Sequence, residues 1–272
     1  MFRFARKGPI EYLESEELLA QGFVTHAFCT RLGGGSTGPH SSLNVGDLVG
    51  DGEENVLRNL ALVREAFAVS DGRLILMRQV HGDRILVLDG DLPRPETLPE
   101  CDGLISDRPG VALGIRTADC APIFFADRTR RIIGAAHAGW RGTALGIAAR
   151  MVDTLAGQFS SRREDLTVLI GPAIGPCCYQ VDAPVFEAFS AMPGADLFLR
   201  PCEEKGRWML DLALANRLQI RDAGVPSENI HDSGLCTSCR QDLFFSHRAG
   251  GGSAGRQISL LMLRTGDDPK NA

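Results

Sequence analysis

A cysteine and a histidine flank a strand-like apolar segment in the middle of the chain. The stretch "TADCAPIFFADRTRRIIGAAHAGWRG" covers residues 117–142, with Cys120 near one end and His137 near the other. Polar residues 127–130 separate two runs rich in β-branched and aromatic side chains, which indicates a hairpin. If Arg128 and Thr129 form a two-residue loop, Cys120 pairs directly with His137 and both side chains lie on one face.

That pairing would allow a thiol and an imidazole to share one site. Directly paired residues have Cβ atoms about 4.5–5.5 Å apart, and Zn²⁺ binds thiolate sulfur at about 2.3 Å and imidazole nitrogen at about 2.0 Å. A register slip of two residues would keep the pair on one face, whereas a slip of one would separate it. The alternative is a buried thiol and a hydrogen-bonded core histidine.

The neighbours of this pair favour a functional site. Asp119 precedes Cys120, and Arg141 follows His137 in "HAGWRG". An arginine is suited to holding phosphate or a developing negative charge. Zinc would need a third ligand, and among the remaining histidines His81 is the best placed, because it ends the apolar run of "LMRQVHGDRI".

Two glycine-rich loops share a pattern, "FCTRLGGGSTG" at 28–38 and "FSHRAGGGSAG" at 245–255. Both contain GxGxxG, but neither is followed by a helical pattern, so neither fits a dinucleotide fingerprint. Such a loop can still direct backbone N–H groups at an anion. Arg31 and Arg248 lie just ahead of these glycines and are candidate anion-binding residues, with plain turn chemistry as the alternative.

The remaining cysteine pairs give no comparable pattern. "CTSC" at 236–239 is a lone CxxC, and the adjacent Cys177 and Cys178 do not supply the spacing of a zinc ribbon. We expect both pairs to be structural or incidental. Eight cysteines in 272 residues are too sparse for a disulfide scaffold and are interpreted as thiols.

The elements that position these residues mix helices and strands without strict alternation. Helical patterns cover 51–69, 142–157 and 211–223, and strand patterns cover 74–77, 84–89, 111–116, 121–126, 131–138, 166–171, 243–247 and 257–263. This order predicts an α+β fold, with mixed β-sheets flanked by helices in a single domain over residues 1–272.

The bulk composition narrows the class of protein. With 44% hydrophobic and 23% charged residues, the chain has the composition of a soluble globular protein. A net charge of −5 argues against a dedicated binder of nucleic acid or membrane surfaces. The first segment has scattered charges and no continuous apolar stretch, so we expect no signal peptide, no membrane span and a cytoplasmic location.

Several motifs together resemble the YfiH-type family, also called the laccase-domain or multicopper polyphenol oxidoreductase family. They are "LMRQVHGDRI", "CDGLIS", "IRTADCAPIFFAD", "AAHAGWRGT", "IGPAIGPCCYQV" and "FFSHR", and the likeness extends over nearly the whole chain. The resemblance implies a CNF/YfiH-like fold and a zinc site made by His81, Cys120 and His137. Three protein ligands leave one coordination position open, as in catalytic zinc sites.

The resemblance also implies an activity on purine nucleosides and phosphate, by a monomer or a homodimer. The implied reaction is phosphorolysis of adenosine, inosine, guanosine and S-methyl-5′-thioadenosine, with deamination of adenosine as a second reaction. Zinc lowers the pKa of bound water to about 7, which suits attack on the purine C6. In phosphorolysis, Arg31, Arg141 and Arg248 would hold the phosphate. Asn44 or Asp119 would bond the ribose or the base.

Three other functions compete with this interpretation. A thiol hydrolase would use Cys120 as nucleophile and His137 as base, and it would be active without metal but inactivated by alkylation. A copper-dependent phenol oxidase follows the older family label, but the six histidines of the chain are too few for several copper ions. A non-catalytic zinc module would need a fourth protein ligand.

Overall fold

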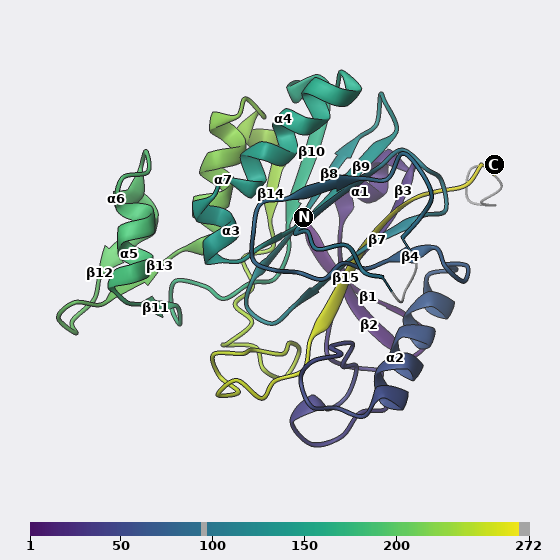
Figure 1. Ribbon diagram of the computed structural model, residues 1–272, viewed down its shortest axis with the longest axis horizontal. Helices are drawn as coiled ribbons and strands as arrows, with labels where there is room; N and C mark the ends of the chain where they lie inside the picture. Colours follow the sequence, from purple (N-terminus) through teal and green to yellow (C-terminus); the bar gives the residue numbers. More distant parts are fainter. Residues whose placement is uncertain (94–96, 267–272) are drawn as a thin grey trace.

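Two six-stranded sheets form the centre of the protein (Figure 1). The computed structural model describes residues 1–93 and 97–266. The first sheet contains, in spatial order, β1 (Phe2–Lys7), β2 (Ile10–Ser15), β3 (Val24–Cys29), β15 (Gln257–Leu263), β7 (Ala112–Thr117) and β4 (Leu74–Ile75). Only its β4–β7 pair is parallel among the described strands, so the sheet is mixed.

The second sheet carries the strands of the opening motif. Its order is β14 (Ile230–Asp232), β10 (Leu166–Ile170), β8 (Ala121–Asp127), β9 (Ile132–Ala138), β6 (Gly103–Ser106) and β5 (Ile85–Val87). β8 and β9 are buried along their whole length, as expected for strands covered on both faces. A small third sheet contains β11 (Gln180–Val181), β13 (Trp208–Leu210) and β12 (Leu199–Pro201).

The helices of the described residues pack against these three sheets and against one another (Figure 1). They are α1 (Glu16–Gln21), α2 (Glu53–Ala66), α3 (Trp140–Ala144), α4 (Ile147–Phe159), α5 (Ala183–Ser190), α6 (Ala195–Phe198) and α7 (Leu212–Asp222), with 3-10 turns at Gly38–His40, Arg163–Asp165 and Ser227–Asn229. α4 and α7 pack on the second sheet, and α2 packs on the first. None of the helices in the described residues is long and apolar enough to cross a membrane.

The core between the sheets explains their arrangement. Phe28 of β3 stacks on Phe124 of β8 with ring centroids 4.5 Å apart, which joins the inner faces of the two sheets. Apolar side chains of both sheets fill this layer, so their burial stabilises the face-to-face packing. The α+β class with mixed sheets flanked by helices is therefore confirmed.

Three details differ from the sequence predictions. The helix expected over 142–157 is divided into α3 and α4, because Gly146 adopts the left-handed conformation between them. The strand expected at 243–247 is wrong, since this segment forms turns with Phe244 and Phe245 buried. The helices over 51–69 and 211–223 are confirmed as α2 and α7, in shorter form.

The third difference concerns the β8–β9 hairpin. Its closing pair is Asp127 with Ile132, so the loop contains residues 128–131 instead of two residues, and Pro122 pairs with His137. The predicted direct pairing of Cys120 with His137 is therefore wrong by two positions. Because side chains alternate with a period of two, this slip leaves both residues on the same face.

Candidate metal centre and active site

His81, Cys120 and His137 converge on one point from three separate segments. Their potential ligand atoms all lie within 4.8 Å of one another. The two imidazole rings meet edge to face, with centroids 4.8 Å apart and an interplanar angle of 79°. His137 is buried, Cys120 is partly exposed and His81 is exposed, so the group lies where the interior meets a cavity.

β8 and β9 position two of these side chains. His137 lies in β9, and Cys120 immediately precedes β8, beyond the pair formed by Ala121 and Ala138. Gly139 leaves the space between the three groups open. A Cβ at this position would lie 2.9 Å from Sγ of Cys120 and 3.0 Å from Cδ2 of His81.

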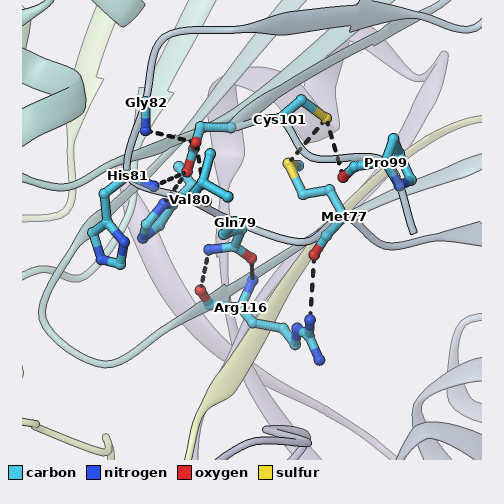
Figure 2. Close-up of polar contacts among 10 residues, drawn as sticks. Met77, Gln79, Val80, His81, Gly82, Pro99, Cys101 and Arg116 are labelled. Atoms are coloured by element: carbon cyan, nitrogen blue, oxygen red, sulfur yellow. Dashed lines mark hydrogen bonds and ion pairs between the residues drawn. The ribbon is translucent and has the colours of Figure 1, made fainter. Parts of the chain in front are cut away.

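A carboxylate that sequence analysis missed, Asp102, holds His81 in place. It is fully buried and accepts backbone hydrogen bonds from Val80 (3.2 Å), His81 (3.0 Å) and Gly82 (2.7 Å), and Figure 2 shows this turn. His81 has a left-handed φ of 60°. The three N–H contacts therefore stabilise a backbone conformation that a histidine seldom adopts.

Asp102 also orients His137. The Nδ1–H of His137 donates to Oδ1 of Asp102 over 2.8 Å, which leaves Nε2 as the free ring nitrogen. β6 pairs with β9 through Gly103 and Ala136, so the residue before β6 lies beside His137. The one sequence signal was a carboxylate directly before a buried apolar strand in "CDGLIS".

The charges of the centre shift the pKa values of its members. Burial raises the pKa of the Cys120 thiol, but His137 and His81 outweigh it and lower the value to about 6. Burial lowers the pKa of His137, but Cys120 and Asp102 outweigh it and raise the value to about 9. Burial likewise raises the pKa of Asp102, yet the His137 contact and backbone N–H groups hold it below its usual range.

Asp119 fixes the backbone next to Cys120. Its φ is 91°, a conformation that costs on the order of 1–3 kcal/mol for a non-glycine residue. Its carboxylate accepts from the hydroxyl of Thr237 and from the backbone N–H of Arg248, both over 2.7 Å. Its carbonyl accepts from the N–H of Ile174 over 2.9 Å. These contacts hold the strained turn that presents Cys120.

The centre opens into a cavity of about 780 Å³. Of the predicted residues, Asp119, Arg141 and Arg248 line it together with the three converging groups. The side chain of Arg141 extends over Trp140 with its Cζ 4.3 Å from the ring centroid, and its guanidinium forms no hydrogen bond or salt bridge within the described residues. Its donors are therefore free to bind an anion.

Sequence analysis missed other cavity-lining side chains, namely Arg116, Tyr179, His247 and Arg256. Arg116 forms a 2.8 Å salt bridge with Asp47. The side chain of Gln79 bonds both backbone groups of Arg116, as Figure 2 shows, and so ties the His81 segment to β7. These residues lie far apart in the sequence, and no local pattern connected them.

Two predicted residues do not line the cavity. Arg31 donates to the carbonyls of Ser41 (2.7 Å) and Gln241 (3.1 Å) and lies over the ring of Phe245. Asn44 is fully buried, and its Oδ1 accepts from the N–H of Arg256 over 2.8 Å. Arg31 therefore connects the first glycine-rich loop with the second, and Asn44 holds the backbone directly after the second loop.

Fold and site together define an α+β protein with a histidine–cysteine–histidine centre open to an arginine-lined cavity. Residues 25–264 match the family described as multi-copper polyphenol oxidoreductase laccase. The chain belongs to this family, as its motifs indicated.

Known relatives agree with this assignment. The chain is 41% identical over 240 residues to "Purine nucleoside phosphorylase YlmD" of Geobacillus stearothermophilus, covering 85% of this chain and 87% of that protein. It is 35% identical over 259 residues to "Purine nucleoside phosphorylase" of Bacteroides thetaiotaomicron, covering 91% and 94%. The crystal structure of the Bacillus licheniformis hypothetical protein YfiH matches with a TM-score of 0.89 at 38% identity, over 96% of this chain and 99% of that chain.

Proposed function

We propose that this chain is a zinc-dependent purine nucleoside phosphorylase with adenosine deamination as a second reaction. Its substrates would be adenosine, inosine, guanosine, S-methyl-5′-thioadenosine and phosphate. The observation that carries the proposal is the convergence of three ligand atoms at an arginine-lined cavity, in a chain whose relatives are named for this activity. The proposal takes residues 1–272 as one catalytic domain of a cytoplasmic monomer or homodimer.

The donor set fits a catalytic zinc ion. Ligands of one tetrahedral zinc ion lie about 3.5 Å apart, given bonds of about 2.0–2.3 Å. The three ligand atoms already lie within 4.8 Å, and Gly139 leaves room between them. When bound, zinc supplies Lewis-acid chemistry and a more acidic water. Zinc is preferred over several coppers, because only two of the six histidines belong to a possible metal group among the described residues.

Arg141 and Arg248 would bind the attacking phosphate. In phosphorolysis a phosphate oxygen forms a bond to C1′ while the glycosidic C–N bond breaks and the purine leaves with the bonding electrons. Arg141 and Arg248 line the cavity and would hold the phosphate dianion against C1′. Asp119 would present Cys120 and contact the nucleoside at the cavity surface. Arg31 and Asn44 would act as positioning residues for the loops behind the cavity.

Product analysis tests the proposal directly. Metal-analysed protein is incubated with adenosine, with and without phosphate. Adenine and ribose 1-phosphate that form only with phosphate support the phosphorylase, and inosine supports the deaminase. Absence of all these products contradicts both activities.

Arg141→Ala tests the proposed phosphate site. Loss of a donor that stabilises transition-state charge reduces the rate by about 100-fold or more, so we expect phosphorolysis to fall by at least this factor. Arg162→Ala is the matched control, because Arg162 is exposed and pairs with Asp165 on the surface. Wild-type phosphorolysis by Arg141→Ala would remove this residue from the mechanism.

A thiol hydrolase is the second candidate. Asp102 accepts a hydrogen bond from His137, and the ligand atom of His137 lies within 4.8 Å of Sγ of Cys120, so the three side chains resemble an acid–base–nucleophile triad. This function predicts full activity on an ester or amide substrate after zinc removal, and inactivation by iodoacetamide. Zinc-bound Cys120 would instead be protected from alkylation, so the two candidates give opposite results.

A further inference from the structure

A second group of sulfur ligands lies outside the centre described above. Cys177 and Cys178 lie between β10 and β11, and Cys236 and Cys239 follow β14. Their four Sγ atoms all lie within 4.8 Å of one another, with 3.5 Å between those of Cys177 and Cys239 and 3.4 Å between those of Cys178 and Cys239. The sequence spacing did not connect the two pairs, whereas the structure brings them together.

The parallel pairing of β10 with β14 explains how the pairs meet. Val168 pairs with Ile230 and Ile170 with Asp232, so both segments leave the sheet side by side at the same edge (Figure 1). A further parallel bridge joins Ala173 to Cys236. The fold thus delivers two cysteine pairs, about 60 residues apart in the chain, to one place.

The geometry suits one tetrahedral ion held by four thiolates. Zn–S bonds of about 2.3 Å place the sulfurs of such a site about 3.8 Å apart, close to the separations found. The backbone N–H of Gly175 donates to Sγ of Cys236 over 3.2 Å, a contact that stabilises a metal-bound thiolate. All four residues are free cysteines, and each is exposed or partly exposed. They can therefore take up an ion from solvent.

We propose that Cys177, Cys178, Cys236 and Cys239 bind a structural Zn²⁺ ion, separate from the His81–Cys120–His137 centre. Four protein ligands leave no open position, so this ion would have no substrate-binding role. The metal assignment does not depend on the proposed catalytic function.

The position of the cluster gives the ion a role in shaping the cavity. The segment that carries Cys177 and Cys178 also supplies Ile174 and Tyr179 to the cavity lining, and the segment after Cys239 supplies Arg248. The hydroxyl of Thr237, between the last two ligands, bonds Asp119. A zinc ion bound here would therefore hold together two segments that line the cavity beside the His81–Cys120–His137 centre.

Metal content tests the proposal. We expect the purified wild type to contain about two zinc ions per chain, and Cys239→Ser and Cys120→Ser each to contain about one. Cys202→Ser is the control, because Cys202 is a partly exposed cysteine outside both groups, and it should retain two. A Cys239→Ser protein with the same zinc content as the wild type would overturn the proposal.

X-ray absorption of the wild type gives an answer even if the variants fail to fold. Four sulfurs at one ion and one sulfur at the other predict an average of about 2.5 sulfurs per zinc at about 2.3 Å. An average of about one sulfur would contradict the four-thiolate site. Iron in place of zinc, or a disulfide among these cysteines in the intact mass of unreduced protein, would overturn it as well.

Discussion

Asp102→Asn should lower both the stability of the fold and the zinc affinity of the His81–Cys120–His137 centre. Oδ1 of Asp102 accepts from His81 and His137, and Oδ2 accepts from Val80 and Gly82. An asparagine amide retains only one oxygen, so its NH₂ group must face two donors in either orientation. Each buried donor without an acceptor costs about 1–3 kcal/mol. We therefore expect the free energy of unfolding to fall by about 2–6 kcal/mol.

The same substitution should weaken zinc binding. Without the carboxylate, Nδ1–H of His137 loses its anionic acceptor, and in the orientation that turns the amide NH₂ toward the ring the proton moves to Nε2, which then cannot bind the metal. Loss of such a partner reduces metal affinity by about 10–100-fold. Zinc competition with a chromophoric chelator, in the Cys239→Ser background, measures this effect at the first centre alone.

Asp83→Asn is the matched control, because Asp83 lies near the same turn but pairs with the exposed Arg150. It should retain wild-type zinc affinity and lose less than about 1 kcal/mol of stability. If Asp102→Asn binds zinc as tightly as Asp83→Asn and unfolds at the same denaturant concentration, the assigned role of Asp102 is refuted.

Two further predictions concern the stability of the fold. Gly171→Ala should lower the free energy of unfolding by about 1–3 kcal/mol in urea titrations. The added Cβ would lie 2.3 Å from Cδ1 of Phe28, so the two sheets would have to move apart. An unfolding free energy equal to that of the wild type would show that this movement has no cost. Burial, with a smaller contribution from Arg264, lowers the pKa of His26 to about 3, so the folded state excludes a proton that the unfolded state binds below about pH 6.5. Between pH 7 and pH 5 the wild type should therefore lose about 2 kcal/mol more stability than His26→Gln, and equal losses in the two proteins would contradict the buried neutral imidazole.

The shared face of Cys120 and His137 could be predicted from sequence because it depends only on strand alternation. The loop length was misjudged, with residues 128–131 in place of two residues, yet the slip moved the register by two and preserved the face. The helix at 142–157 shows the limit of periodicity. The helical pattern of apolar residues continues across Gly146. In the structure, however, Gly146 adopts the left-handed conformation, so α3 ends before it and α4 begins after it.

The partners of this pair depended on contacts between distant segments. Asp102 reaches His137 because β6 pairs with β9, and Arg256 lies near Asn44 because β15 returns beside β3. Neither register could be predicted from residue spacing, since any two buried strands of similar composition could pair. For the same reason, Arg31 was expected to hold an anion at the cavity, whereas in the structure it contacts two backbone carbonyls.

By itself, the sequence determined the α+β class, the β8–β9 hairpin and the chemical character of three convergent ligands, through local periodicity and motif resemblance. Only the tertiary structure decided which carboxylate orients His137, which arginines reach the cavity, and that Cys177 and Cys178 meet Cys236 and Cys239. The physical reason is that side-chain alternation is local to a strand, whereas the pairing of strands is chosen by burial over the whole core.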